Sequence, residues 1–100
     1  MQKIETNPLR EISLSGALSK PLLDAGKARA LLLNLDAGQA VAPCQTPFLV
    51  LYYFIEGQAQ MRMGDEQAEF QTGSLVAVPA GAVRSISASQ QTRVLAVQIP

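Results

Sequence analysis

Arg84 and Cys44 are the side chains of this sequence best suited to chemistry, because the sequence contains no histidine. Histidine is the commonest metal ligand and the commonest general base, so its absence removes the usual route to both functions. A guanidinium such as that of Arg84 can pair bidentately with a carboxylate or a phosphate. Cys44 is the single cysteine, and a deprotonated thiol can act as a nucleophile or a redox sensor. These residue types favour anion binding and thiol chemistry.

Arg84 lies in a stretch that predicts two strands joined by a corner. Residues 75–78 are apolar, Pro79-Ala80-Gly81 follows, and residues 83–87 resume an extended pattern. Proline fixes φ and lacks a donor for the sheet, while Gly81 can adopt a positive φ. The stretch is therefore typical of a corner in a β-barrel.

The sequence from residue 28 onwards predicts short strands separated by turns. Residues 48–55 are β-branched or aromatic along nearly their whole length, which favours a strand covered on both faces. Gly64-Asp65 indicates a two-residue hairpin turn. The other predicted strands are residues 28–35, 39–42, 60–63, 67–70 and 93–99. The pattern predicts an all-β chain that forms a single antiparallel β-barrel, or jelly roll, whose closure hides the strand edges.

The first 27 residues form an N-terminal extension with weaker signals. Ile12 and Leu14 alternate with serines as in a short strand, and Ser19-Lys20-Pro21 is typical of a turn. A length of 100 residues suits one compact domain, so we expect residues 1–100 to form a single barrel domain.

The composition excludes several classes of partner. Eight basic and eight acidic residues cancel, and no Lys/Arg cluster offers the positive surface that nucleic acids or anionic membranes require. No long apolar run predicts a signal peptide or a membrane span, so we expect a cytoplasmic protein, and an unpaired cysteine fits a reducing compartment. An apolar content of 48% favours a homodimer, with the run from Leu31 to Leu33 as the candidate interface.

Two segments resemble the two motifs of the cupin family of small β-barrels. The first motif places a glycine, His-x-His, a glutamate and a glycine at fixed intervals, and the same intervals here fall on Gly38, Cys44, Thr46, Val50 and Gly57. The second motif places a glycine, Pro-x-Gly, a histidine and an asparagine, and its intervals fall on Gly73, Pro79, Gly81, Arg84 and Ala88. The resemblance covers close to half of the chain and implies a cupin barrel.

The resemblance fails at the metal ligands of the family. Their four positions are occupied here by Cys44, Thr46, Val50 and Arg84. Threonine is a poor ligand, valine is none, and an arginine repels a cation. We therefore expect a metal-free cupin without a cofactor, and the metal-dependent activities of the family do not carry over.

Ligand positions of a metal site converge, so the resemblance also implies that Cys44 and Arg84 lie close together. A fixed positive charge nearby would favour the thiolate and make Cys44 reactive. The preferred alternative is a small, buried Cys44 that fills the space of a lost histidine.

In a cupin barrel, strand alternation would give the interior a mostly apolar lining. Phe48, Val50, Tyr52 and Phe54 would share this face with Cys44 and Thr46. Counted from Gly57, the side chains of Ala59, Met61 and Met63 also point inward, and those of Gln60 and Arg62 point outward. Such walls with a few polar groups are typical of small-molecule sites. We predict a site for a small apolar or anionic metabolite, lined by Arg84, Cys44, Thr46, Val50, Tyr52, Met61 and Met63.

Each of these residues also has a structural interpretation. Arg84 could extend to the barrel mouth and pair with a surface acid or solvent. Tyr52, Met61 and Met63 are more often wall or core residues, and Thr46 could cap its own loop. The eight carboxylates miss the motif positions, with Glu66 in a solvated hairpin, so paired-carboxylate catalysis has no support.

Three functions follow, in order of preference. The first is a binding protein, with sensing as one use, that holds a small metabolite in a metal-free barrel. The second is a metal-independent enzyme, isomerase-like or thiol-dependent, that uses Cys44, Arg84 or Tyr52. The third is a structural barrel whose interior is filled by its own side chains.

Overall fold

The chain folds into nine strands in the computed structural model, which describes residues 1–100. The predicted all-β class is confirmed, and no helix is long and apolar enough to cross a membrane. In chain order the strands are β1 (Leu18–Asp24), β2 (Arg29–Leu35), β3 (Ala40–Cys44), β4 (Leu49–Glu56), β5 (Gln58–Met63), β6 (Glu66–Gln71), β7 (Leu75–Val78), β8 (Arg84–Ala88) and β9 (Thr92–Ile99).

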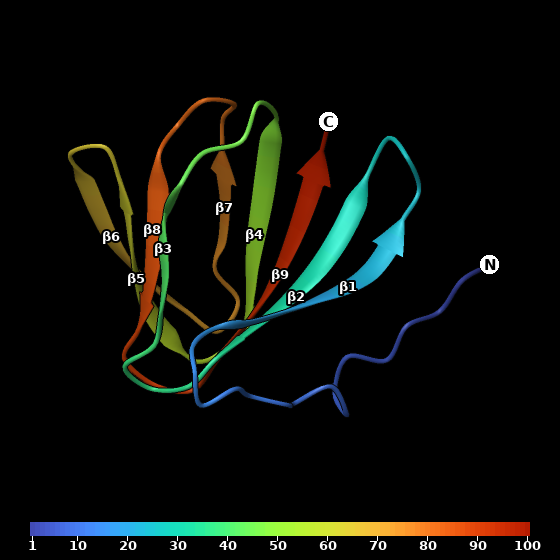
Figure 1. Ribbon diagram of the computed structural model, residues 1–100, viewed down its shortest axis with the longest axis horizontal. Helices are drawn as coiled ribbons and strands as arrows, with labels where there is room; N and C mark the ends of the chain where they lie inside the picture. The colour runs from blue at the N-terminus through green and yellow to red at the C-terminus, as the bar shows by residue number, and fades with distance from the viewer.

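The strands form two antiparallel sheets that face each other (Figure 1). The larger sheet has the order β1-β2-β9-β4-β7, and the smaller sheet has the order β3-β8-β5-β6. Neighbours in each sheet that are distant in sequence, such as β2 with β9 and β3 with β8, give the jelly-roll topology that the sequence predicts. The β3–β4 and β7–β8 loops lie at the upper end of the molecule in Figure 1.

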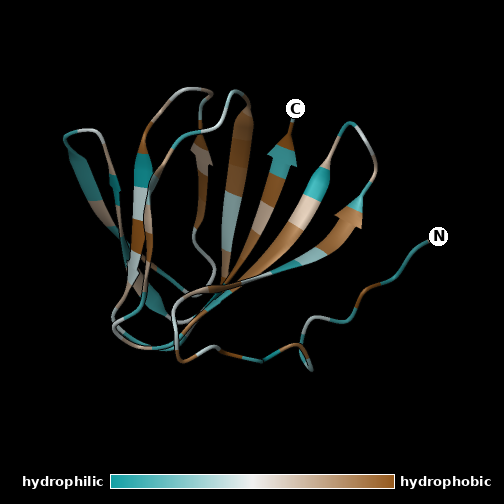
Figure 2. Cartoon of the chain, viewed as in Figure 1, coloured by the Kyte–Doolittle hydropathy of each residue, from teal (hydrophilic) through white to brown (hydrophobic).

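Apolar side chains fill the space between the two sheets. Hydrophobic residues are dense along β4, β9 and β2 in Figure 2. The rings of Phe54 and Phe70 stack with their centroids 5.1 Å apart and tie β4 to β6. The inward positions predicted for β5 are confirmed, since Ala59 and Met61 are buried whereas Gln60 and Arg62 are exposed. The buried cluster consists of Leu35, Val50, Tyr52, Phe54, Ala59, Met61, Val78, Ile86, Ala88, Val94 and Ala96.

The corner at residues 79–81 connects β7 to β8 as predicted. Gly81 has a φ of 81°, which is a conformation that L-residues with a side chain rarely adopt. Its backbone N–H donates to the carbonyl oxygen of Thr46 at 2.8 Å. This hydrogen bond holds the β7–β8 loop against the β3–β4 loop, so the two loops that carry motif residues form one end of the molecule.

The predicted turn at Ser19-Lys20-Pro21 is wrong, because these residues lie inside β1. β1 is the edge of the larger sheet, where a proline without a backbone donor is tolerated. The pairing with β2 also shifts register between Pro21 and Leu23. The predicted strand around Ile12 and Leu14 is reduced to one bridge between Ser13 and Gly16.

The N-terminal segment before β1 lies against the larger sheet. The side-chain amide of Asn34 donates to the carbonyl oxygens of Leu9 and Glu11, each at 2.9 Å. Arg93 donates to the carbonyls of Thr6 and Leu9 and forms an ion pair with Glu56. These contacts provide partners for most of the polar atoms of the two buried residues, and only Asn34 Oδ1 and Arg93 Nε have none.

The proposed dimer segment is already partly used within the chain. Leu32 has no exposed surface, and Leu31 and Leu33 pack against the core cluster. Among the large apolar residues within strands, the most exposed are Leu75 on β7 and Tyr53 on β4, which are register partners.

Candidate functional site

Strand register brings several of the predicted site residues to the upper end of the molecule in Figure 1. Across the smaller sheet, the paired residues of one row are Cys44, Arg84, Met63 and Glu66. Across the larger sheet, the row near the same end contains Val78, Val50, Gln98 and Arg29. The β-sheets therefore position both arginines, one on β8 and one on β2.

Arg84 places a buried positive charge at this end. Only 4% of its surface is exposed. Its Nε donates to the Tyr52 hydroxyl at 3.0 Å, and its Nη1 donates to Thr46 Oγ1 at 3.4 Å. No carboxylate lies within 4.0 Å of its guanidinium, so it does not pair with a surface acid. A buried charge whose only protein partners are neutral hydroxyls is costly, and an anion would compensate for that cost.

Tyr52 is the main neutral partner of Arg84. Its ring lies below the guanidinium, with 5.7 Å between the Arg84 Cζ atom and the ring centroid. Burial raises the pKa of Tyr52 above its ordinary value of 10.0, and the Arg84 hydrogen bond and charge act in the opposite direction. Tyr52 is therefore a neutral phenol at physiological pH. Its oxygen accepts from Arg84, and its O–H has no acceptor in the protein, so it is free to donate to a ligand.

Thr46 holds Arg84 and the β3–β4 loop together. Its hydroxyl donates to the carbonyl of Phe48 at 2.8 Å and accepts from Arg84. The interpretation of Thr46 as a cap of its own loop is thus confirmed. Beside it lies an open hollow of about 400 Å³ lined by Gln45, Thr46, Pro47 and Gly81.

Cys44 lies next to Arg84 but is exposed. The two residues are register partners on β3 and β8, as the converging positions imply. The interpretation of Cys44 as a buried filler is wrong. β3 is the edge of the smaller sheet, and its pairing with β8 shifts register between Val41 and Cys44. Such an irregularity interrupts the inward and outward alternation on which the prediction relied.

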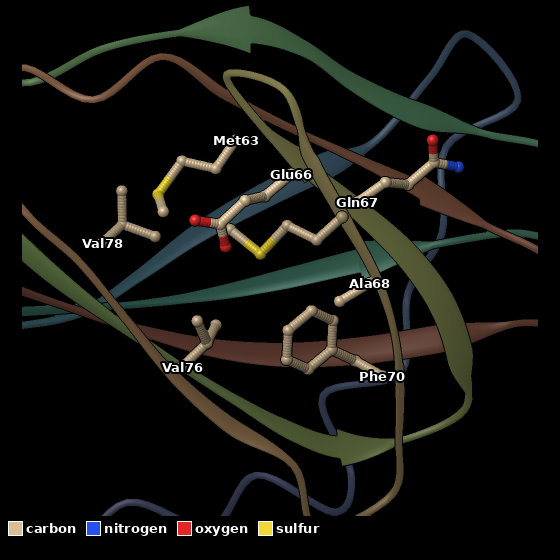
Figure 3. Close-up of a pocket in the computed structure, with 8 residues that line it drawn as sticks. Met63, Glu66, Gln67, Ala68, Phe70, Val76 and Val78 are labelled. Carbon is tan, nitrogen blue, oxygen red and sulfur yellow. The ribbon is translucent and has the colours of Figure 1, made fainter.

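The apolar part of the predicted site is packed rather than hollow. Val50 and Met61 are buried in the core cluster. Met61 and Met63 border a cavity of about 60 Å³ between β5, β6 and β7 (Figure 3). Small-molecule sites are typically about 300 to 1,000 Å³, so this cavity holds no metabolite-sized ligand. Glu66 borders it too, and Figure 3 shows its carboxylate near Met63.

Arg29 is the residue at this end that sequence reasoning missed. Its Cζ atom lies 5.4 Å from the centroid of the Phe48 ring. Its Nε is buried and has no hydrogen-bond partner, and no carboxylate forms an ion pair with it. The available signal was a single charge at the start of an apolar strand, which is the same pattern that drew attention to Arg84.

Comparison with known structures gives the fold. A cupin from Desulfovibrio desulfuricans has a TM-score of 0.92 at 14% identity, over 100% of this chain and 97% of the other. A Klebsiella pneumoniae protein with a double-stranded β-helix domain has a TM-score of 0.92 at 15% identity, over 100% and 90%. The chain has the cupin fold. A cupin superfamily protein from Desulfitobacterium hafniense agrees, with a TM-score of 0.85 at 20% identity over 92% and 84%. No protein-family model and no curated protein matches the sequence.

The donor set of this cupin-fold chain does not fit a metal ion. Cys44, Thr46, Val50 and Arg84 occupy the four ligand positions of the family motifs. No three side chains of histidine, cysteine, aspartate or glutamate lie together as a metal site requires. Val50 has no donor atom, and the Arg84 guanidinium brings a positive charge to the place of a cation. The residues present at the motif positions suit an anion instead.

Proposed function

We propose that this cupin-fold protein binds a small anionic metabolite at the Arg84 end of the barrel without a metal or another cofactor. The observation that carries the proposal is the environment of Arg84, which is 4% exposed and has two hydroxyl groups as its only protein partners. A carboxylate is the simplest anion that matches the planar fork of a guanidinium.

The other buried arginine of the chain provides an internal comparison. Arg93 is 3% exposed, and its Nη1 and Nη2 atoms bind the Glu56 carboxylate and two backbone carbonyls, while its Nε has no partner. Arg84 has the same burial and lacks any such anionic or carbonyl partner. The contrast supports a binding role for Arg84, since a purely structural arginine in this chain is compensated by the protein itself.

The predicted site residues take different roles in this proposal. Arg84 and Tyr52 provide the donors, because Arg84 Nη2 and the Tyr52 O–H have no acceptor in the protein. Thr46 fixes the Arg84 orientation, and exposed Cys44 lies at the rim beside it. Val50 and Met61 are part of the packed core, and Met63 packs against it. Because the interior is packed, the metabolite enters from the hollow at Thr46 and does not fill the barrel.

The experiment is a calorimetric titration with sodium propionate, which carries one carboxylate and a short apolar tail, at constant ionic strength. We expect millimolar binding, weakened about tenfold or more in Arg84→Gln, since a charge-assisted hydrogen bond contributes on the order of 1.5–3 kcal/mol. Arg62→Gln is the matched control, because Arg62 lies on the outward face of β5 and its side chain hydrogen-bonds only to Gln67. Equal weakening in both variants, or none in Arg84→Gln, contradicts the proposal.

We also propose that the protein is a cytoplasmic homodimer. The unpaired cysteine supports a reducing compartment. The exposed outward residues Tyr53 and Leu75 support a subunit contact better than Leu32, which has no surface left to bury. Sedimentation at micromolar concentration should show a dimer, and a Leu75→Asp variant should shift it to a monomer. A monomeric parent protein would end this proposal.

A further inference from the structure

Arg29 is a second arginine without an anion at the same end of the molecule. It begins β2, and its register partner is Gln98 on β9, which in turn is paired with Val50 on β4. Its Nε atom is buried and has no hydrogen-bond acceptor, and no carboxylate lies within 4.0 Å of its guanidinium. The Nε atom of Arg93 is unpartnered too, but the Arg93 guanidinium pairs with the Glu56 carboxylate, a compensation that Arg29 lacks.

The two arginines contact the same short segment of the β3–β4 loop. Arg84 donates to the hydroxyl of Thr46, and this hydroxyl donates to the carbonyl of Phe48. The Phe48 ring in turn receives the guanidinium of Arg29 at 5.4 Å. The loop segment 46–48 is therefore flanked by two positive groups, neither of which is neutralised by a carboxylate.

Open space lies beside Arg29 and beside Thr46, the hydrogen-bond partner of Arg84. A hollow of about 400 Å³ is bordered by Gln45, Thr46, Pro47 and Gly81. A hollow of about 480 Å³ is bordered by Arg29, Leu31 and Gln98 together with Gln2 and residues of β1, and Asp24 is one of these. Both volumes lie in the usual range of small-molecule sites. Asp24, the register partner of Arg29, is occupied by its own turn, since its carboxylate accepts from the backbone N–H of Gly26 at 2.9 Å.

We infer that the ligand carries two carboxylates, one bound by Arg84 and the other by Arg29, with the chain between them crossing the 46–48 segment. The inference rests on the proposed function, because it uses the Arg84 site as the first of its two anchors. A dianion compensates both guanidinium groups at once, whereas a monoanion leaves one of them without a partner. Joining the two groups in one molecule also raises the effective concentration of the second at its site.

The fold bounds the separation of the two carboxylates. Arg29 and the matching position of β4 lie two strands apart, which is about 10 Å of backbone. The Arg29 guanidinium extends back towards β4 far enough to reach the Phe48 ring. Arg84 stands on β8 of the other sheet, so the length of the dicarboxylate should decide whether it reaches both arginines.

The test compares propionate with straight-chain dicarboxylates from succinate to suberate by calorimetry at constant ionic strength. We expect at least one of the longer dicarboxylates to bind about tenfold or more tightly than propionate. Arg29→Gln should abolish that advantage while propionate binding changes less than twofold. If every dicarboxylate binds like propionate, or if the advantage persists in Arg29→Gln, the inference is wrong.

The design separates failure of this inference from failure of the proposed function. Propionate that binds in an Arg84-dependent way without a dicarboxylate advantage overturns only the two-carboxylate ligand. Binding of both compounds that is insensitive to Arg84→Gln overturns the proposed function itself. Arg29→Lys guards against a folding artefact, because it keeps the charge and removes the planar fork. It should retain part of the dicarboxylate advantage, and its melting temperature should match that of the parent protein.

Discussion

Replacement of Gly57 by alanine should destabilise the protein far more than replacement of Gly73, although both glycines belong to the cupin-like motifs. Gly57 joins β4 to β5 with a φ of 111°. A Cβ atom there would lie 2.5 Å from the Gln91 carbonyl oxygen and 2.6 Å from Thr92 Cα. At Gly73 the φ is 91°, and a Cβ atom would meet nothing within 4 Å.

The expected magnitudes follow from these two environments. A residue held at an unfavourable positive φ costs about 1–3 kcal/mol, and this applies to both variants. Gly57→Ala must in addition displace buried backbone at the start of β9, which costs a further 1–3 kcal/mol or so. Its total loss of about 2–6 kcal/mol is a large share of the roughly 5–15 kcal/mol of a typical domain.

The assay is urea unfolding followed by far-ultraviolet circular dichroism for the parent protein and both variants. Gly57→Ala should show a markedly lower midpoint, or fail to fold, and Gly73→Ala should show the smaller loss. Equal losses in the two variants would refute the reasoning, because they would mean that β9 does not approach Gly57 as the structure shows.

Three further predictions concern the N-terminal segment, Tyr52 and metals. Asn34→Ala should lower the unfolding free energy by about 1–3 kcal/mol, because the backbone carbonyls of Leu9 and Glu11 lose their donor. The freed N-terminal segment should also be cleaved faster by trypsin after Arg10. The control Asn7→Ala, at an exposed position, should change neither the stability nor the cleavage rate. Because the pKa of Tyr52 is raised in the native state, its contribution to stability is complete below pH 10 and is lost as the pH rises through that native pKa. The free energy of unfolding of Tyr52→Phe should therefore fall less steeply above pH 10 than that of the parent protein. Equal slopes in the two proteins would contradict this prediction. Native mass spectrometry with metal analysis should find no stoichiometric metal in the purified protein, and one metal ion per chain would overturn the proposed site.

The sequence predicted the strands well where local chemistry determines them. Glycine and proline mark the ends of β5, β6 and β7. The apolar run at 48–55 favoured a strand, and it forms β4, although the prediction that both faces are covered is wrong at Tyr53, which is exposed. The turn predicted at Ser19-Lys20-Pro21 failed because its true conformation depends on pairing with β2 at a sheet edge. Pairing between distant segments overrides local turn propensity, and no local pattern reports it.

The candidate site was predicted less completely than the fold. The motif spacing placed Arg84 in the site and strand alternation placed Tyr52 on the inner face, and the two side chains share a hydrogen bond. Exposure of Cys44 depends on a register shift in β3, and the packed interior around Met61 depends on side chains from three strands. Arg29 was missed because it lies on β2, outside both motifs, and its approach to Phe48 depends on tertiary packing that no local pattern reports.

The central claim is that Arg84 binds an anion, and nuclear magnetic resonance of the arginine side chains tests it most directly. The Arg84 Nε–H is buried and hydrogen-bonded to Tyr52, so it should give a resolved signal that disappears in Arg84→Lys. Titration with propionate should shift this signal to saturation while the Arg62 signal stays in place. An Arg84 signal that does not move, or that moves no more than that of Arg62, would contradict the account.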